Sequence, residues 1–141
     1  MHDIATVETQ LALIPRENIL SIWPQVEAML LPAIERSDGR WDKWAVITGL
    51  VNAQMELWIA HRDGKPEAAM IGRIQEFPCM RVYALPWLGG KYMRHWMHFE
   101  PAVVEYARSR GCKELEGYGR KGFQRVVPHW KFSWTFMRRP I

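Results

Sequence analysis

The pair Gly89-Gly90, followed by Lys91, is the part of this 141-residue chain best suited to bind an anion. Glycine adopts positive φ readily, so successive backbone N–H groups at a Gly-Gly turn can point into one concavity. A helix predicted to begin near Lys91 adds its unpaired amides and the positive end of its dipole. This stretch therefore predicts a phosphate or pyrophosphate site, with a plain tight turn as the alternative.

Two other patterns look like ligand motifs but lack the residues that such motifs need. Residues 117–122 read G-x-G-x-x-G, yet only one or two helical turns are expected after them, and no acidic residue follows about 20 positions on to bind a dinucleotide ribose. At most an anion nest is expected there, beside Arg120 and Lys121. His95 and His98 share a helical spacing, but no cysteine or third histidine joins them at zinc-like spacing, so no metal site is predicted.

Length and composition favour a single soluble domain. The chain is 48% apolar, which is enough for one core, and it is too short for two ordinary domains. No apolar run approaches the roughly 20 residues that cross a bilayer, and the N-terminus lacks the pattern of a signal peptide. Cys79 and Cys112 form no C-x-x-C pair and are expected to be small buried thiols beside strands, which fits a reducing cytoplasm.

The formal net charge of +4 favours anionic ligands but is modest for a dedicated nucleic-acid binder. The chain also has eight tryptophans, and aromatic residues interleaved with basic ones can bind single-stranded nucleic acid by stacking. Most of the tryptophans are at apolar positions of predicted helices and strands, where a small core would bury them, so nucleic acid is not the expected partner. An exposed tryptophan cluster would instead favour docking of another protein. Basic residues without any acid gather in the C-terminal part, as a binding face or a solvated surface: Lys121, Arg125, Lys131, Arg138 and Arg139.

The elements that must position the glycines follow from the hydrophobic periodicity. A first strand is predicted over residues 9–14. Apolar residues recur every three or four positions over 19–34, which predicts a helix that starts properly near Pro24 or kinks there. A second and shorter helix is predicted over 41–51.

Three strands are predicted before the glycines and a helix after them. Two strands, over 55–60 and 68–74, flank the hairpin signal Asp63-Gly64, and a third covers 80–85. The helix spans 92–110, with a kink or a restart at Pro101 and a stop at Gly111. The remaining expected elements are a strand over 113–118, helical turns over 123–127 and a closing strand over 132–137.

This order, β-α-α-β-β-β-(GG)-α-β-α-β, resembles the GNAT fold of acyl-CoA-dependent N-acyltransferases. The resemblance rests on residues 63–72, 107–115 and 127–132 and covers roughly 54–138. It implies one α/β (α+β) domain over residues 1–141, with a central mixed, mostly antiparallel sheet flanked by helices. It also implies a V-shaped splay between the fourth and fifth strands.

The resemblance implies acetyl-CoA or another acyl-CoA as the cofactor. In the family, the pyrophosphate binds backbone amides of the loop after the fourth strand, which corresponds to residues 86–92 here. The pantetheine runs along the fourth strand, whose backbone also polarises the thioester carbonyl. The cofactor-binding residues expected in this chain are Tyr83, Ala84, Leu85, Leu88, Gly89, Gly90 and Lys91.

Acyl transfer to an amine needs a base, an oxyanion donor and an acid for the departing thiolate. Glu76, at the end of the third strand, is the candidate base, with a plain surface carboxylate as the alternative. Tyr118, on or just beyond the fifth strand, is the candidate acid, with an ordinary half-buried strand tyrosine as the alternative.

Residues 116–123, Glu-Gly-Tyr-Gly-Arg-Lys-Gly-Phe, resemble small divergent GNAT-like proteins of phages and prophages. Two hypotheses follow. The chain is an intact or degenerate acyl-CoA-dependent N-acyltransferase acting on a small-molecule or protein amine, or it is a non-catalytic structural or interaction module that binds phage or host proteins. We expect it in the cytoplasm, or in the virion under the second hypothesis, and without a membrane partner.

Overall fold

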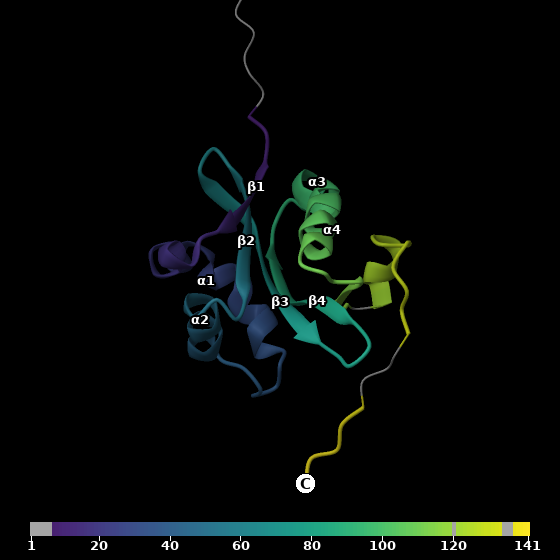
Figure 1. The fold of residues 1–141 in the computed structure, drawn as a ribbon. Coiled ribbons are helices and arrows are strands. Elements are labelled where there is room, and N and C mark those ends of the chain that lie inside the picture. Colours follow the sequence, from purple (N-terminus) through teal and green to yellow (C-terminus); the bar gives the residue numbers. More distant parts are fainter. Residues whose placement is uncertain (1–6, 120, 134–136) are drawn as a thin grey trace, which may run out of the picture.

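The computed structural model describes residues 7–119, 121–133 and 137–141 (Figure 1). Five strands form one sheet in the order β1-β2-β3-β4-β5. Neighbouring strands are antiparallel, except for the parallel pair β4 and β5. The strand bounds are β1 Gln10–Ile14, β2 Glu56–Arg62, β3 Lys65–Glu76, β4 Arg81–Gly90 and β5 Glu114–Gly117.

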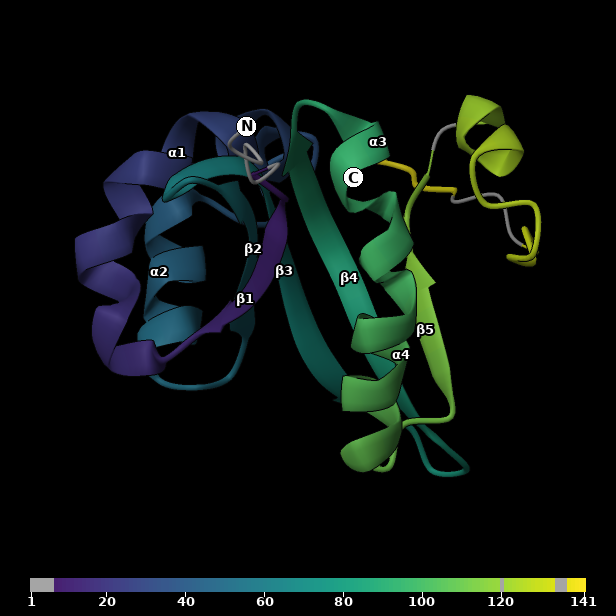
Figure 2. The ribbon, with the colours of Figure 1, turned by 90° about the horizontal axis from the view of Figure 1, so that it is seen from above.

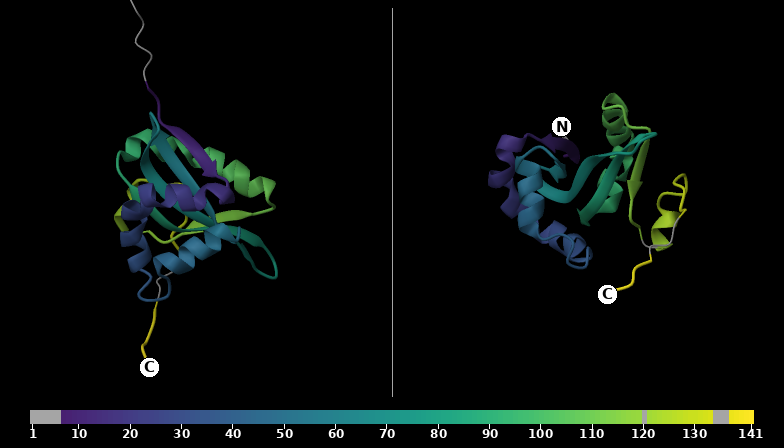
Figure 3. Two further views of the ribbon diagram at one scale, coloured as in Figure 1. Left: turned by 90° about the vertical axis from the view of Figure 1, so that its left-hand side faces the viewer. Right: turned by 60° about the horizontal axis from the view of Figure 1, so that its bottom comes forward.

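Helices cover both faces of this sheet, as predicted (Figure 2). One face carries α1 (Ile19–Glu35) and α2 (Lys43–Val51), which Figure 3 shows side by side in its left view. The other face carries α4 (Glu100–Ser109), preceded by the single turns α3 (Met93–Trp96) and η2 (Met97–Phe99). The short helix η3 (Lys121–Arg125) lies at the β5 edge of the molecule (Figures 2 and 3).

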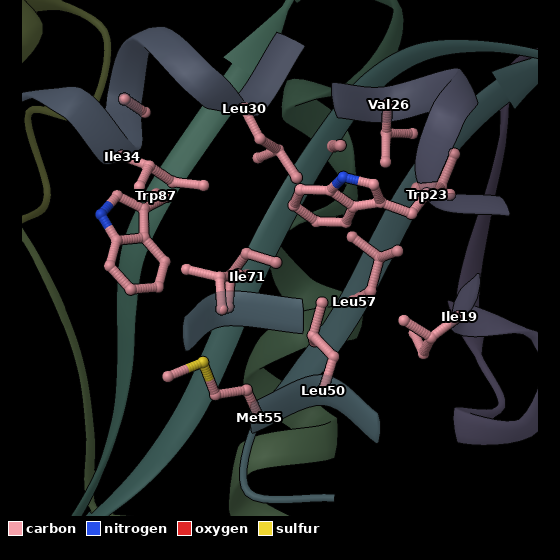
Figure 4. Close-up of a cluster of buried hydrophobic side chains, with 14 residues drawn as sticks. Ile19, Trp23, Val26, Leu30, Ile34, Leu50, Met55, Leu57, Ile71 and Trp87 are labelled. Carbon is pink, nitrogen blue, oxygen red and sulfur yellow. The ribbon is translucent and has the colours of Figure 1, made fainter. Parts of the chain in front are cut away.

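Two hydrophobic clusters hold the layers together. The larger one fills the space between the sheet and α1 and α2, and its side chains interdigitate in Figure 4. The smaller one lies between the sheet and α4 and is centred on Trp58, Tyr83 and Val103. Alternation along the strands explains this division, since Leu57 and Trp58 are neighbours in β2 and point to opposite faces.

The first helix differs from its prediction. It runs from Ile19 to Glu35 and contains both Pro24 and Pro32, so the predicted start near Pro24 is wrong. Both prolines are exposed, while Trp23, Val26 and Leu30 are buried. Burial of one continuous apolar stripe therefore outweighs the two backbone hydrogen bonds that the prolines cannot donate.

Several local predictions are confirmed. The turn between β2 and β3 has positive φ at both Asp63 (51°) and Gly64 (75°), as a tight type I′ hairpin requires. The predicted helix over 92–110 restarts near Pro101, which lies in the first turn of α4. Gly111 follows this helix with φ at 80°, a conformation that favours glycine.

Other predictions are not met. Cys112 is buried as expected, but Cys79 is exposed in the β3–β4 connection. The closing strand predicted over 132–137 is not formed at residues 132, 133 or 137, and residues 134–136 lie outside the described part of the chain. No described helix combines the length and apolarity needed to cross a bilayer.

Candidate functional site

The parallel strands β4 and β5 pair over only part of their length. Their register begins at Val82 opposite Glu114 and ends at Leu85 opposite Gly117. Strand β4 nevertheless continues to Gly90, still paired with β3 on its other side. In the part of the chain that the structure describes, the edge of β4 that faces β5 therefore has no strand partner over residues 86–90, and this opening is the splay predicted between the fourth and fifth strands.

A β-bulge lies at the apex of this opening. Ile71 is opposite Trp87 and Arg73 is opposite Ala84, so Gly72 faces two residues of β4, Leu85 and Pro86. A bulge leaves part of the ladder unpaired and bends its strand. Pro86 has no N–H group, so its place at the bulge costs no ladder hydrogen bond. The bulge therefore turns β4 away from β5 at the point where their pairing ends.

The two glycines do not form the predicted turn. Gly89 and Gly90 are the last residues of β4, so the prediction of a strand ending at Leu85 is wrong. Gly90 is paired with Ala68 of β3, and a Cβ atom added at Gly89 would lie 1.8 Å from the backbone carbonyl oxygen of Met29 in α1. The glycines thus allow close packing of backbone against backbone, and they do so as part of a strand.

The turn into α3 comes just after the glycines. The N–H of Lys91 donates to the carbonyl of Glu67, at 2.8 Å, and Tyr92 has a left-handed conformation with φ at 58°. Trp96 Nε1 donates to the carbonyl of Lys91 at 2.7 Å, which braces this turn from α3. We call residues 91–95 the β4–α3 corner. Lys91 is exposed there, so its ammonium is accessible to an anion.

Glu76 does not lie beside the opening. It is the last residue of β3 and is opposite Arg81 at the start of β4, which is the far end of β4 from the splay. Its carboxylate forms an ion pair with Arg81. The predicted position of Glu76 at the cleft is therefore wrong, because a hairpin returns the chain only to the start of the next strand.

The remaining cofactor-binding residues divide at the apex. Tyr83 and Ala84 are opposite Leu115 and Glu116, so β5 covers their edge and they cannot line the opening as predicted. Leu85 lies at the apex itself. Beyond it Leu88, Gly89, Gly90 and Lys91 follow along the open side.

Tyr118 and Glu116 lie on either side of the last β4–β5 pair. Tyr118 follows Gly117 directly and its side chain is 86% exposed. Glu116 is half-buried and shares a row across the sheet with Ala84 and Arg73. The sequence analysis missed Glu116. Leu115 packs in the cluster beneath α4, and because side chains alternate along a strand, Glu116 points to the other face of the sheet.

That opposite face is the one covered by α1 and α2. The guanidinium of Arg73 lies over the ring of Trp41, 5.7 Å from its centre, and Trp41 packs against the cluster on this side. In the part of the chain that the structure describes, no ion pair or hydrogen bond engages the Glu116 carboxylate. A carboxylate without a partner at the apex is able to accept a proton or bind an ammonium group.

A second polar group lies beneath α4. Glu56 accepts hydrogen bonds from the hydroxyls of Tyr83, at 2.9 Å, and Tyr106, at 2.7 Å, and Trp58 Nε1 donates to the Tyr83 hydroxyl at 2.8 Å. Burial, together with the adjacent Glu56 carboxylate, raises the pKa of Tyr83 above its ordinary value and that of Tyr106 to about 12. Since every partner is internal, this group links β2, β4 and α4 and is structural.

The two candidate metal-binding histidines are not brought together. The imidazole of His95 contacts Glu67, whereas that of His98 is exposed and packs against Phe99. Within residues 7–119, 121–133 and 137–141, no three histidine, cysteine or acidic side chains are grouped to hold a metal.

Comparison with solved structures decides the fold. The chain aligns over 94% of its length with 96% of an aminoglycoside acetyltransferase from an uncultured soil metagenomic sample, in complex with sisomicin, with a TM-score of 0.69 and 9% identity. It aligns with the aminoglycoside N-acetyltransferase AAC(6')-Iy, in complex with CoA, over 96% of both chains, with a TM-score of 0.69 and 14% identity. The chain has the GNAT fold.

A third solved structure carries that family's full name. The chain covers 98% of a GCN5-related N-acetyltransferase from Ralstonia eutropha JMP134, with 94% of its own length aligned, a TM-score of 0.63 and 14% identity. No protein-family profile matches the sequence, and no curated protein matches it. At these identities the likeness is one of fold, and it assigns no substrate to this chain.

Proposed function

We propose that this chain is an acyl-CoA-dependent N-acyltransferase. The observation that carries the proposal is the early end of the β4–β5 pairing at Leu85 and Gly117, while β4 continues to Gly90. The open edge is five residues long, or about 16 Å at the rise of a strand. An extended chain with amide groups, such as pantetheine, can pair with such an edge as an additional strand would.

The residues around the opening fit an acyl-CoA. At its far end the β4–α3 corner carries Lys91 and Arg94, both exposed, where a ligand lying along β4 would place its phosphates. At the apex the bulge at Leu85 and Pro86 frees part of the backbone ladder for the thioester end. Leu85, Leu88, Gly89, Gly90 and Lys91 thus remain the proposed cofactor-binding residues.

The acyl-CoA would supply an activated carbonyl carbon and a thiolate leaving group. Glu116, in place of Glu76, is the proposed base, because its carboxylate lies one residue before the apex and has no described partner. It would take the proton from the acceptor amine as the C–N bond forms. Tyr118 remains the proposed acid, and its hydroxyl would give a proton to the sulfur as the C–S bond breaks.

The acceptor is proposed only as an amine. The fold neighbours include two aminoglycoside acetyltransferases and a ribosomal-protein-alanine N-acetyltransferase from Brucella melitensis biovar Abortus 2308. By these names, proteins with this fold acetylate both small molecules and a protein. The open position of Glu116 beside the face with Trp41 and Arg73 is compatible with a cationic acceptor approaching from the α1–α2 side.

One observation favours the second candidate function, a non-catalytic module of the kind encoded by phages. Gly89 and Gly90 serve packing and strand pairing, so the Gly-Gly turn expected to bind the pyrophosphate is not formed in this chain. The exposed side chain of Trp44 and the basic residues after β5 would then serve a phage or host protein partner.

Thermal unfolding with acetyl-CoA separates the two functions. A ligand selective for the folded state raises Tm by mass action, so millimolar acetyl-CoA should raise it if the opening binds the cofactor. Release of free thiol from acetyl-CoA with a panel of amines then measures transfer. If acetyl-CoA neither raises Tm nor releases free thiol, the transferase proposal is overturned and the non-catalytic module is the remaining candidate.

Matched variants assign the roles at the apex. Glu116→Gln and Tyr118→Phe should each lower the transfer rate by about 10²-fold, because each removes one proton-transfer group. Both should keep the Tm shift with acetyl-CoA, since neither lies on the open edge of β4. Glu76→Gln is the control and should leave the rate unchanged, because its carboxylate is at the other end of the sheet.

A further inference from the structure

Strand β1 is at the edge of the sheet, where the left view of Figure 3 shows it in purple, and its outer side is unpaired. Within the described part of the chain, β1 forms backbone hydrogen bonds only with β2. It reads Gln-Leu-Ala-Leu-Ile and contains no charge, no proline and no bulge. Soluble proteins usually protect an edge strand with one of these devices, because an unpaired edge is a template for another strand. The outer edge of β1 is therefore able to accept a further strand.

This edge is anchored at both ends. Thr9, directly before β1, is buried, and its hydroxyl donates to Glu67 Oε1 at 2.6 Å and accepts from Arg62 Nε at 3.3 Å. Ile14, the last residue of β1, packs against the cluster beneath α1 and α2. Because β1 is already ordered, pairing with it costs little conformational entropy.

Two charges of opposite sign flank β1 symmetrically. Glu8 is two residues before the strand and Arg16 is two residues after it, so each is four positions from Ala12 at its centre. Both side chains are exposed, and within the described residues neither forms an ion pair or a hydrogen bond. Two antiparallel copies of β1 centred on Ala12 would place Glu8 of each copy opposite Arg16 of the other.

Symmetry and charge together select this register. A two-fold axis that relates two antiparallel edge strands is normal to the sheet, so each face of one sheet continues as the same face of the other. Opposed residues must then lie on one face, which requires the axis to pass at a residue and not between two residues. Centring on Leu11 or Leu13 would move Glu8 two positions away from Arg16. Only Ala12 at the centre pairs the charges.

The same register pairs apolar side chains on the α4 side of the edge. Leu11 packs partly against the cluster beneath α4, and Leu13, two residues further on the same face, is 38% exposed. Each Leu11 would be opposite Leu13 of the second copy. Pairing would therefore remove exposed apolar surface from water.

A surface pocket at the start of β1 suits an incoming arginine. Its lining includes Glu8, Gln10, His61 of β2 and Asp63 of the hairpin turn. Gln10 and His61 are opposite each other in the β1–β2 ladder and therefore share a face. An arginine brought to Glu8 would thus meet two carboxylates at this end of the sheet, and a guanidinium binds carboxylates strongly.

We propose that this chain forms a two-fold symmetric dimer in which β1 pairs with β1 of a second copy, antiparallel and centred on Ala12. The two five-stranded sheets would then be continuous. Because β2 and β3 separate β1 from β4, the inference does not depend on the proposed function and leaves the opening between β4 and β5 exposed. A single short strand is a small interface, so we expect a dissociation constant of about 10–100 μM.

The test is analytical ultracentrifugation between about 5 and 500 μM, a range that brackets the expected dissociation constant. The wild type should change from monomer to dimer and grow no further. Leu13→Lys should remain monomeric, because a lysine protects an edge strand from pairing. Met80→Lys is the matched control, since Met80 is also 38% exposed but lies in the β3–β4 connection, and it should dimerise as the wild type does.

Charge reversal tests the register. Glu8→Arg and Arg16→Glu each turn two attractive pairs of the dimer into two repulsive ones, so each should weaken it by about tenfold. The double variant Glu8→Arg/Arg16→Glu should restore the affinity of the wild type. A structural effect of either substitution alone would not be rescued in this way.

Three results would overturn the inference. The first is a wild type that stays monomeric at every concentration, and the second is a dimer that Leu13→Lys leaves intact. The third is an assembly that grows beyond the dimer, which would mean that β1 pairs with a different surface of the next copy. A double variant no stronger than the single variants would overturn the register centred on Ala12. If Leu13→Lys fails to fold by circular dichroism, the charge reversals at the two exposed positions still decide.

Discussion

At Gly89 a single methyl group decides whether α1 can lie against the sheet. An added Cβ would meet the carbonyl oxygen of Met29 at 1.8 Å, so the backbone of β4 or of α1 would have to shift. Gly89→Ala should therefore lower the free energy of unfolding by about 3 kcal/mol, measured by urea denaturation. Gly122→Ala, which meets no atom within 4 Å, is the control and should change it little. Equal stabilities would contradict the packing role.

Tyr106 makes the free energy of unfolding depend on pH in the alkaline range. Its pKa is raised to about 12 by burial and by Glu56, so between about pH 10 and pH 12 the unfolded state loses the proton first. Stability from this residue is complete below pH 10 and is lost as the pH rises toward 12. The free energy of unfolding should fall less steeply from pH 10 to 11.5 in Tyr106→Phe than in the wild type.

Tyr106→Phe should also be less stable at pH 7, by about 1 kcal/mol, because Glu56 loses one of its two phenol donors. Identical slopes for the variant and the wild type would place the alkaline transition in other groups.

Among the helices, α1 is the element that departs furthest from local preference. Pro24 is exposed and lies inside the helix, where it cannot donate to the carbonyl of Leu20. Pro24→Ala should raise the free energy of unfolding by about 1–2 kcal/mol, after part of the helix gain is offset by the greater freedom of the unfolded chain. Gln25→Ala, at the next exposed position, should change it by only tenths of a kcal/mol. A destabilised Pro24→Ala would mean that the proline ring itself packs.

Elements with a strong local signal could be predicted from the sequence. The Asp63-Gly64 hairpin, the restart at Pro101 and the stop at Gly111 each depend on the φ preference of one or two residues, and each is confirmed. The order of the elements was then enough to predict the GNAT fold. The two glycines after Pro86 carry the same local signal as a turn, and there the prediction is wrong.

The part of the site that could not be predicted depends on contacts between distant residues. Gly89 is in a strand because α1 must approach it, and nothing near Gly89 in the sequence indicates that contact. Glu76 lies in the predicted strand but at the end of the sheet far from the opening, because the β3–β4 register places it opposite Arg81, the first residue of β4. Glu67 and His95 are 28 positions apart and meet only in the folded chain.

For the molecule as a whole, one sheet serves both hydrophobic clusters, so they should unfold together. Leu30→Ala, in the larger cluster, should lower the free energy of unfolding by about 2–5 kcal/mol, and Val103→Ala in the smaller one should lower it as well. In both variants, far-UV circular dichroism and tryptophan fluorescence should report one common transition. Two separate transitions would show that the clusters are independent.

The short parallel ladder between β4 and β5 also bears on how the protein folds and opens. The strands β2, β3 and β4 are joined by short connections and can assemble from near neighbours, whereas the connection from β4 to β5 passes through α4, so we expect β5 to dock late. Amide hydrogen exchange in the native state should accordingly be faster in β5 than in β2 and β3. We therefore expect the two walls of the opening to belong to an early-forming and a late-forming unit, and to part while the hairpins remain intact.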